Sequence, residues 1–171
     1  MAKIFGIIGW SGSGKTDVVC RVIKYIKKKK VCVSSIKHTH HDFQIDKPGK
    51  DSFKQLNSGS NEVIIYSEKK WAMVSSLQIQ EIKLSDIITK FSNQTEIIIL
   101  EGMKFSKIPK IEVYRSSLNK PLLCRNDKYI KAIIYDKLNP KFSNYKIPKF
   151  SFNDTKGIGE FILNFTKNEN E

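Results

Sequence analysis

The sequence predicts an α/β fold with three layers, in which helices cover a mainly parallel central sheet, together with a β-hairpin insertion. Two observations support this fold class. Short β-branched runs alternate with segments of helical period along the chain, as expected for strands joined by right-handed crossovers. The most apolar run, residues 97–100, is typical of a strand covered on both faces. Such a sheet is expected to bind its ligand at the carboxyl ends of the strands.

The first elements follow from apolar periodicity. Residues 4–8 are an apolar run and predict the first strand, whereas the segment after residue 16 has the period of a helix. The apolar positions of this helix are Val18, Val19, Val22, Ile23 and Ile26. Residues 31–36 are rich in β-branched side chains and predict the second strand. Residues 37–50 lack periodicity and are rich in His, Asp, Pro and Gly, which indicates a long loop.

A short helix and a hairpin are predicted next. Asp51 is expected to cap a helix that ends at Gly59. Residues 62–66 and 71–75 have the composition of strands and lie close together in the chain. They therefore predict a β-hairpin.

The remaining elements alternate again. Ser85 is expected to cap a helix over residues 86–91, and residues 110–114 and 130–135 predict further strands. The last helix is predicted to begin near residues 153–154. Its apolar face comprises Ile158, Phe161, Ile162 and Phe165.

A length of 171 residues suits one domain, predicted over residues 1–167 and followed by a frayed tail at residues 168–171. The three cysteines lie far apart without C-x-x-C spacing, which favours reduced thiols and an intracellular protein. The apolar run at residues 4–8 is interpreted as a strand and not as a signal peptide. No apolar run approaches the ~20 residues of a membrane helix, so no membrane partner is expected.

The formal net charge of +13 raises the question of nucleic-acid binding. Of the 30 basic residues, 27 are lysine, and only Arg21, Arg115 and Arg125 are arginine. The lysines are scattered along the chain, whereas a specific nucleic-acid reader more often has clustered arginines with interleaved aromatic residues. Nucleic acid is therefore a disfavoured partner, although the basic surface favours anionic partners in general.

Residues 9–16 match the phosphate-binding loop G-x-x-x-x-G-K-[ST], and they stand between the predicted first strand and first helix, as this P-loop requires. The residues of the loop are Gly9, Trp10, Ser11, Gly12, Ser13, Gly14, Lys15 and Thr16. The glycines let backbone N–H groups close around a phosphate, and the helix adds the positive end of its dipole. Lys15 can reach the β- and γ-phosphates, and the Thr16 hydroxyl can ligate Mg²⁺. The sequence therefore predicts a P-loop NTPase.

A P-loop also needs an acid at the tip of a neighbouring strand, where it positions Mg²⁺ and its waters. Glu101 directly follows the apolar run at residues 97–100 and is the candidate. We expect Lys15, Thr16 and Glu101 to carry any slow hydrolysis, with Thr16 and Glu101 at the metal. The competing interpretation of Glu101 is a solvated acid at the end of a strand.

All three histidines fall in one segment after the second predicted strand, and three interpretations of it are open. The segment comprises Lys37, His38, Thr39, His40, His41 and Asp42. It is a polar loop, a transition-metal site for Zn or Ni, or a mobile segment that faces the phosphates. In the last case Lys37, His38 and Lys50 contact phosphates or an anionic substrate. The acids that would orient Mg²⁺ waters are then Asp42, Asp46 and Asp51.

Several blocks in this order resemble the MobB family, the molybdopterin-guanine dinucleotide biosynthesis adapter proteins. Besides residues 9–16, the blocks are Lys37-His38-Thr39-His40-His41-Asp42, Asp46-Lys47-Pro48-Gly49-Lys50-Asp51-Ser52, Lys70-Trp71-Ala72-Met73, Leu100-Glu101-Gly102-Met103-Lys104 and Pro109-Lys110-Ile111-Glu112-Val113-Tyr114-Arg115. The blocks at residues 37–42 and 46–52 are much more specific than the P-loop alone.

The resemblance implies a cytoplasmic, GTP-binding homodimer with weak GTPase activity. Such a protein assists a MobA-like guanylyltransferase, which joins GMP from GTP to molybdopterin. The implied cofactors are GTP and Mg²⁺, with molybdopterin or its guanine dinucleotide as further ligands. By position, residues 9–16 bind the triphosphate, Thr16 and Glu101 serve Mg²⁺, and residues 38–42 and 46–52 shape the loop that faces the phosphates or the cofactor.

One position departs from the family pattern. Asp17 stands where the family usually has a hydroxyl residue able to bond the α-phosphate. A carboxylate ~4 Å from a phosphate is repelled by about 1 kcal/mol in a water-like dielectric. We expect weaker nucleotide binding and a gain on Asp17→Thr, unless Asp17 turns outward and caps the helix.

Base specificity is weakly encoded, and other functions compete. No N-K-x-D signature is present, and Asp136 is interpreted either as a guanine acceptor or as a solvated loop acid. A small-molecule kinase shares the P-loop but needs an arginine-bearing lid, for which Arg115 and Arg125 are the candidates. A basic nucleic-acid-binding module and a metal-delivery GTPase also compete with the adapter function. An accessory role with at most weak GTPase activity is favoured over a metabolic enzyme.

Overall fold

The computed structural model describes residues 2–39, 43–76 and 82–168 of the chain. Its contacts divide the chain into two compact units. The sheet unit comprises Met1–His38 and Ser92–Glu171, and the hairpin unit comprises Thr39–Phe91. The single domain expected over residues 1–167 stays a prediction.

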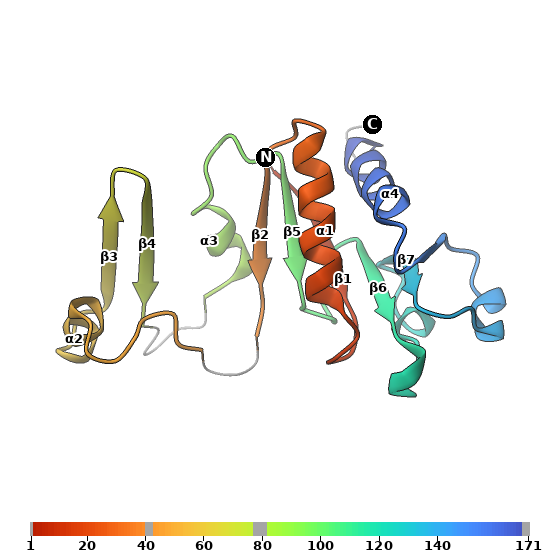
Figure 1. Ribbon diagram of the computed structural model, residues 1–171, viewed down its shortest axis with the longest axis horizontal. Coiled ribbons are helices and arrows are strands. Elements are labelled where there is room, and N and C mark those ends of the chain that lie inside the picture. The colour runs from red at the N-terminus through yellow and green to blue at the C-terminus, as the bar shows by residue number, and fades with distance from the viewer. Residues whose placement is uncertain (1, 40–42, 77–81, 169–171) are drawn as a thin grey trace. The chain divides into compact units, whose positions relative to one another are not determined.

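The sheet unit contains six parallel strands, of which the apolar runs predicted five and missed β8 (Figure 1). The strand order is β2-β5-β1-β6-β7-β8. The strands are β1 Lys3–Ile8, β2 Val33–Lys37, β5 Ile97–Glu101, β6 Lys110–Tyr114, β7 Ile130–Tyr135 and β8 Lys149–Ser151. β1 lies between β5 and β6, so the loop that follows β1 opens at the middle of the carboxyl edge. The predicted α/β class is confirmed.

Two long helices cover one face of this sheet, α1 Lys15–Lys28 and α4 Thr155–Asn168 (Figure 1). The predicted face of α1 is buried at four of its five positions, and Ile23 is partly buried. In α4, Ile158 and Ile162 are buried, whereas Phe161 and Phe165 lie edge-on against the Phe5 ring of β1. The helices thus carry the main apolar core, and they hold the N-terminal end of α1 against the sheet.

The opposite face of the sheet is covered in part by short 3₁₀ segments. The segments that contribute side chains there are η2 Leu123–Arg125 and η3 Pro140–Asn144, and a third, η1 Ser116–Leu118, follows β6. Phe142 of η3 is buried and packs edge-on against Tyr114 and beside Ile133. The third layer is therefore built from turns, which give no periodic signal in the sequence.

The hairpin unit contains the predicted short helix and hairpin, but the residues that cap its two helices differ from those predicted. Its elements are α2 Asp51–Asn57, β3 Glu62–Ser67, β4 Lys70–Ser75 and α3 Leu84–Ile88, and β3 pairs antiparallel with β4. The expected capping by Asp51 is wrong: Lys50 is the N-cap, and the Asp51 carboxylate lies 3.6 Å from the ammonium of Lys54. The expected capping by Ser85 is also wrong, because α3 begins two residues earlier than predicted, with Lys83 as its N-cap. The Asp86 carboxylate accepts from the Lys83 N–H at 3.3 Å.

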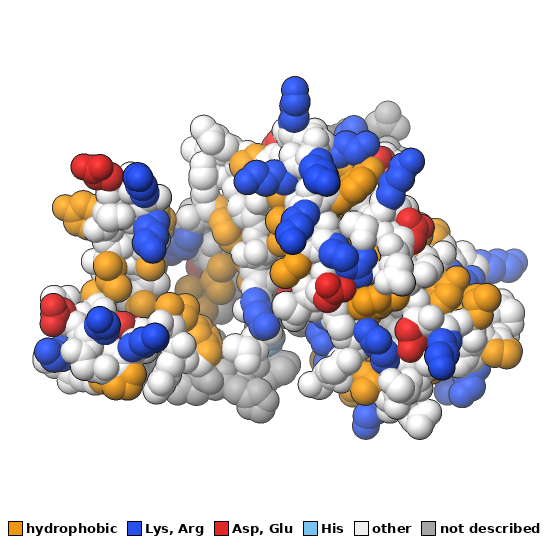
Figure 2. Space-filling view, viewed as in Figure 1, with side chains coloured by type: hydrophobic (Ala, Val, Ile, Leu, Met, Phe, Trp, Pro, Cys, Tyr) orange, Lys and Arg blue, Asp and Glu red, His pale blue; other side chains and the backbone are white. Residues whose placement is uncertain are grey.

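Lysine and arginine side chains are spread over the visible surface rather than gathered in one stripe (Figure 2). None of the helices in the described part of the chain has the length and apolar character to cross a membrane. All three cysteines are free thiols. The Cys124 thiol is half-buried beside Glu112, and burial followed by the charge of Glu112 raises its pKa to about 12.

Candidate nucleotide-binding site

The predicted phosphate-binding loop joins the end of β1 to the start of α1. Gly14 is the N-cap of α1 in a left-handed conformation (φ 89°), and no side chain caps the helix. Gly12 is also left-handed (φ 76°), which lets the loop turn tightly before the helix. An uncapped helix N-terminus directs backbone N–H groups and the positive dipole end toward an anion.

Two loop glycines are required by their surroundings. A Cβ on Gly9 would lie 2.4 Å from the carbonyl oxygen of Val113 in β6. A Cβ on Gly14 would lie 2.7 Å from Nη2 of Arg115 and 2.8 Å from Cζ of Phe152. The loop is therefore packed against the backbone of β6 and against the side chains that follow β6 and β8, which fixes its shape.

Ser13 supplies an orphaned polar atom inside the loop. The residue is 1 % exposed, and its buried hydroxyl oxygen has no hydrogen-bond partner among the described residues. Buried hydroxyl groups are almost always hydrogen-bonded in folded proteins. A polar ligand in the loop would satisfy this group, so the loop fits an anion such as a phosphate.

Lys15 begins α1 and folds back over the loop. Its ammonium donates to the carbonyl oxygen of Trp10 at 2.9 Å. Burial lowers the pKa of Lys15; the charge of Glu101 opposes this shift, while Lys104 and Lys37 lower the pKa further. The side chain therefore holds a partly desolvated positive charge where the phosphates of a nucleotide are predicted to lie.

Thr16 and Glu101, 85 positions apart in the chain, lie in contact. The Thr16 hydroxyl donates to Oε1 of Glu101 at 2.7 Å, and the ammonium of Lys37 lies 3.9 Å from the same oxygen. Glu101 is 8 % exposed, so it is a buried and partnered acid rather than a solvated one. A hydroxyl and a carboxylate are oxygen ligands that suit Mg²⁺, and the pair therefore fits the predicted metal role.

The histidine segment is only partly described. His38 donates its backbone N–H to the Glu101 carbonyl at 2.9 Å and so extends the pairing of β2 with β5. His40, His41 and Asp42 lie outside the described residues. Among the residues that are described, no group of three His, Cys, Asp or Glu side chains could hold a metal ion. The three interpretations of the segment stay predictions.

Three further residues that were predicted to act at the phosphates or at Mg²⁺ belong to the hairpin unit, namely Asp46, Lys50 and Asp51. The Asp46 carboxylate accepts from the N–H of Lys47 at 2.9 Å, and Lys50 and Asp51 begin α2. Their phosphate and magnesium roles stay predictions.

Asp17 turns outward along α1 and does not cap the helix. Its carboxylate pairs with Nε of Arg21 at 2.9 Å, one turn further on. Arg21 also donates to the carbonyl oxygen of Phe152 at 2.7 Å and to the Thr155 hydroxyl. The Asp17 charge is therefore shared with an arginine that links α1 to the start of α4.

Arg115, a candidate lid residue on sequence grounds, lies against the P-loop itself. Its Nε donates to the Ser13 carbonyl oxygen at 3.4 Å, and its guanidinium lies 4.6 Å from the centre of the Phe152 ring. The guanidinium of Arg21 lies 5.1 Å from the same ring. Two features of the sequence could have indicated that Arg115 lies at the site: arginine is scarce in this chain, and Arg115 directly follows a predicted strand.

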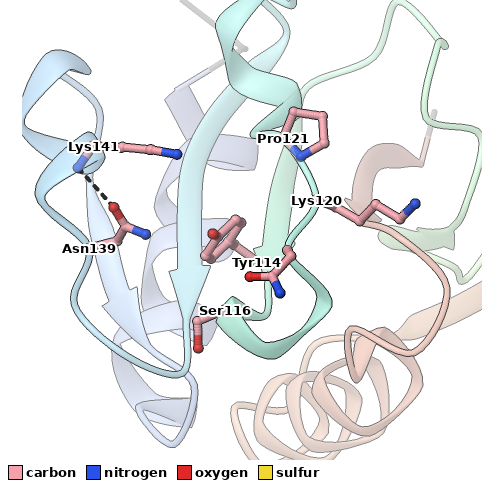
Figure 3. Close-up of a pocket in the computed structure, with 7 residues that line it drawn as sticks. Tyr114, Ser116, Lys120, Pro121, Asn139 and Lys141 are labelled. Carbon is pink, nitrogen blue, oxygen red and sulfur yellow. Dashed lines mark hydrogen bonds between the residues drawn. The ribbon is translucent and has the colours of Figure 1, made fainter.

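A cavity of about 530 Å³ opens beside the loop, next to the ends of β6 and β7 (Figure 3). Its lining comprises Tyr114, Ser116, Asn119, Lys120, Pro121, Asn139 and Lys141. Lys141 and Asn139 approach from one side, Lys120 and Pro121 from the other, and Tyr114 lies between them.

Asp136 forms hydrogen bonds with Ser116, one of the residues that line this cavity. Its carboxylate accepts from the N–H of Ser116 at 2.9 Å and from the Ser116 hydroxyl at 3.0 Å. Burial raises the pKa of Asp136, but the bonds from Ser116 and from the N–H of Lys137 outweigh it, so the pKa is lowered. Both carboxylate oxygens are thus used within the protein, an arrangement that neither interpretation of Asp136 anticipated.

The chain matches a known protein family over most of its length. Residues 4–136 match the family model described as MobB, molybdopterin guanine dinucleotide synthesis protein B. The chain is 36% identical over 131 residues to the molybdopterin-guanine dinucleotide biosynthesis adapter protein of Haemophilus influenzae, covering 76% of this chain and 72% of the relative. It is 27% identical over 173 residues to the adapter protein of Escherichia coli, covering 99% and 97%.

Two solved structures have the same fold. A crystal structure of molybdopterin-guanine biosynthesis protein B aligns with a TM-score of 0.73 at 25% identity, over 95% of this chain and 99% of that one. The crystal structure of Bacillus subtilis MobB aligns with a TM-score of 0.75 at 19% identity, over 95% and 96%. Because the family model covers most of the chain, this protein belongs to the MobB family.

Proposed function

We propose that this protein is a GTP-binding adapter of molybdopterin guanine dinucleotide biosynthesis, with weak Mg²⁺-dependent GTPase activity. The observation that carries the proposal is the 2.7 Å contact between Thr16 and Glu101 beside a glycine-rich loop. A phosphate-binding loop with its metal-binding acid in place is the arrangement that nucleoside triphosphates require. The family membership and the names of the relatives supply the pathway.

Each residue of the site has a distinct role in this proposal. The N–H groups of the loop and the ammonium of Lys15 bind the phosphate oxygens. The Thr16 hydroxyl and the Glu101 carboxylate hold Mg²⁺, which neutralises phosphate charge when it is bound. Lys37, 3.9 Å from Glu101, keeps that carboxylate from carrying an isolated buried charge.

Slow turnover is expected because groups that speed hydrolysis in other P-loop proteins have no counterpart in the sheet unit as described. Arg115 and Arg21 are both engaged with Phe152. No glutamine follows Glu101 in the loop after β5 that would orient a water molecule. A protein that binds GTP and hydrolyses it slowly suits a carrier or a switch.

The remaining parts of the proposal concern partners. We infer that the protein acts as a homodimer in the cytoplasm and assists a MobA-like guanylyltransferase, with molybdopterin or its guanine dinucleotide as a further ligand. Adding the protein to that transferase, GTP and molybdopterin should raise the yield of the guanine dinucleotide. An unchanged yield, together with no copurification of the transferase, would contradict the adapter role.

Glu101→Gln tests the metal-binding acid. We expect this variant to bind GTP with an affinity that no longer rises when Mg²⁺ is added, because a neutral amide is a poorer ligand for Mg²⁺ than a carboxylate. Calorimetric titrations with and without Mg²⁺ measure this difference. Glu68→Gln, an exposed change in the turn of the hairpin, is the control that should keep the magnesium effect. An equal magnesium effect in Glu101→Gln would remove Glu101 from the site.

Asp17→Thr tests the departure from the family pattern. We still expect tighter GTP binding, but by less than about 1 kcal/mol, because the Asp17 charge is already paired with Arg21. Calorimetry of both forms at low ionic strength measures the gain. Weaker or equal binding by the threonine variant would show that Asp17 does not disturb the nucleotide.

A further inference from the structure

The loop that follows Glu101 turns back sharply toward the P-loop. Gly102 (φ 99°) and Met103 (φ 52°) are both left-handed, and the second of them is unusual for a residue with a side chain. The N–H of Gly102 donates to the Ile7 carbonyl at 3.1 Å, which ties this turn to the strand that enters the P-loop. Strained backbone of this kind is often found at functional sites. The turn places residue 104 beside the P-loop.

Lys104 lies on the face of Trp10, the second residue of the P-loop. Its ammonium is 4.4 Å from the centre of the indole ring. The ring is held in place by its own N–H, which donates to the Pro121 carbonyl at 2.8 Å. The carbonyl oxygen of Trp10 is the group that accepts from the Lys15 ammonium. Lys104 and Lys15 are thus both held by the same loop residue.

The charges around this point are unbalanced. Lys37 and Lys104 both lie close enough to Lys15 for their charges to act on it. Among the described residues the opposing charge there is that of Glu101, which already bonds Thr16 and lies close to Lys37. In the described part of the chain, no carboxylate lies within ion-pair distance of the Lys104 ammonium. The group is complementary to a polyanion.

We propose that Lys104 binds the terminal phosphate of a nucleoside triphosphate and thereby distinguishes triphosphate from diphosphate. The inference rests on the proposed binding of nucleotide at the P-loop. A cation on an aromatic face is held weakly, whereas an ammonium bonded to a phosphate makes a charge-assisted hydrogen bond. The flexible lysine stem allows the ammonium to leave the Trp10 ring for the phosphate. Lys104 would thus add positive charge at the terminal phosphate of the bound nucleotide.

Calorimetric titrations of Lys104→Gln with GDP and with a non-hydrolysable GTP analogue, both with Mg²⁺, test this inference. We expect about tenfold weaker binding of the triphosphate, or about 1.4 kcal/mol, with the affinity for GDP unchanged. Lys104→Arg should restore most of the loss. Lys120→Gln is the matched control, since the Lys120 ammonium faces the same ring at 5.8 Å but belongs to the segment after β6. It should bind both nucleotides as the wild type does.

The fluorescence of Trp10 provides a second readout, measured in a Trp71→Phe background because the chain has two tryptophans. The triphosphate analogue should change this emission more than GDP does, and the difference should vanish in Lys104→Gln. An equal loss for both nucleotides would show that Lys104 only steadies the loop, and no loss for either would also overturn the inference. Failure of the wild type to bind any guanine nucleotide would instead refute the proposed function itself.

Discussion

Replacing Lys15 with alanine is expected to weaken GTP binding at least about a hundredfold, or roughly 3 kcal/mol. The Lys15 ammonium is held over the loop by the Trp10 carbonyl at 2.9 Å, where it can exchange that neutral acceptor for phosphate oxygens. Hydrogen bonds between ionised groups are about twice as strong as neutral ones, and the position is partly buried. Calorimetric titration of GTP into both proteins measures the change.

Two controls separate a lost contact from a lost fold. Lys24→Ala removes the same charge from the exposed side of α1 and should bind GTP as the wild type does. Burial lowers the pKa of Lys15, so folding disfavours its charged form, and this unfavourable contribution is present at neutral pH. Lys15→Ala should therefore melt no lower than the wild type without nucleotide. Retained GTP affinity in Lys15→Ala would contradict the whole site.

Glu112→Ala is expected to cost about 3 kcal/mol of folding stability. Glu112 lies in the middle of β6 and is fully buried. Its two carboxylate oxygens accept from the backbone N–H groups of Leu123 at 2.8 Å and Cys124 at 2.9 Å, which start η2. Removing the carboxylate leaves two buried donors without a partner and opens a cavity. Urea unfolding, with the midpoint and slope compared, measures the loss.

Glu112→Gln is the matched variant, because it keeps the size of the side chain and one acceptor oxygen. It should lose less stability than Glu112→Ala. A loss of equal size in both variants would show that the negative charge, and not the acceptor oxygen, holds η2.

The pH dependence of stability in the wild type and in Glu112→Gln tests the ionisation of Glu112. Burial raises the pKa of Glu112 above its ordinary 4.5, although the bonds from Leu123 and Cys124 oppose the shift. A carboxyl with a raised pKa contributes stability that is present below its unfolded value and is lost as the pH rises through the folded value. The stability of the wild type relative to Glu112→Gln should therefore fall between pH 4.5 and neutrality. A constant difference over that window would contradict the raised pKa.

The parts of the site that could be predicted share one property: the information lies in consecutive residues or in a rule about strand ends. The P-loop is a contiguous motif between a strand and a helix. The contact of Thr16 with Glu101 followed because the carboxyl ends of neighbouring parallel strands meet at one edge. The resemblance carried by residues 37–52 added the family, which the match over residues 4–136 then confirmed.

The errors concern features that depend on geometry within a turn or on very short elements. Asp51 and Ser85 have the composition of caps, but each lies inside its helix because the chain enters the helical conformation one or two residues earlier. β8 has only three residues, too few for a periodic pattern, and the 3₁₀ segments of the third layer have none.

Local sequence was sufficient for the strands of the sheet other than β8, for the long helices and for the position of the glycine-rich loop, because backbone preference and apolar period act over a few neighbouring residues. The packing of Arg115 and Phe152 against the loop, the pairing of Asp17 with Arg21 and the use of both Asp136 oxygens by Ser116 became visible only in the folded chain. The direction of a side chain and the partner that it meets depend on elements far away in the sequence, and these are brought together only when the sheet and its helices pack.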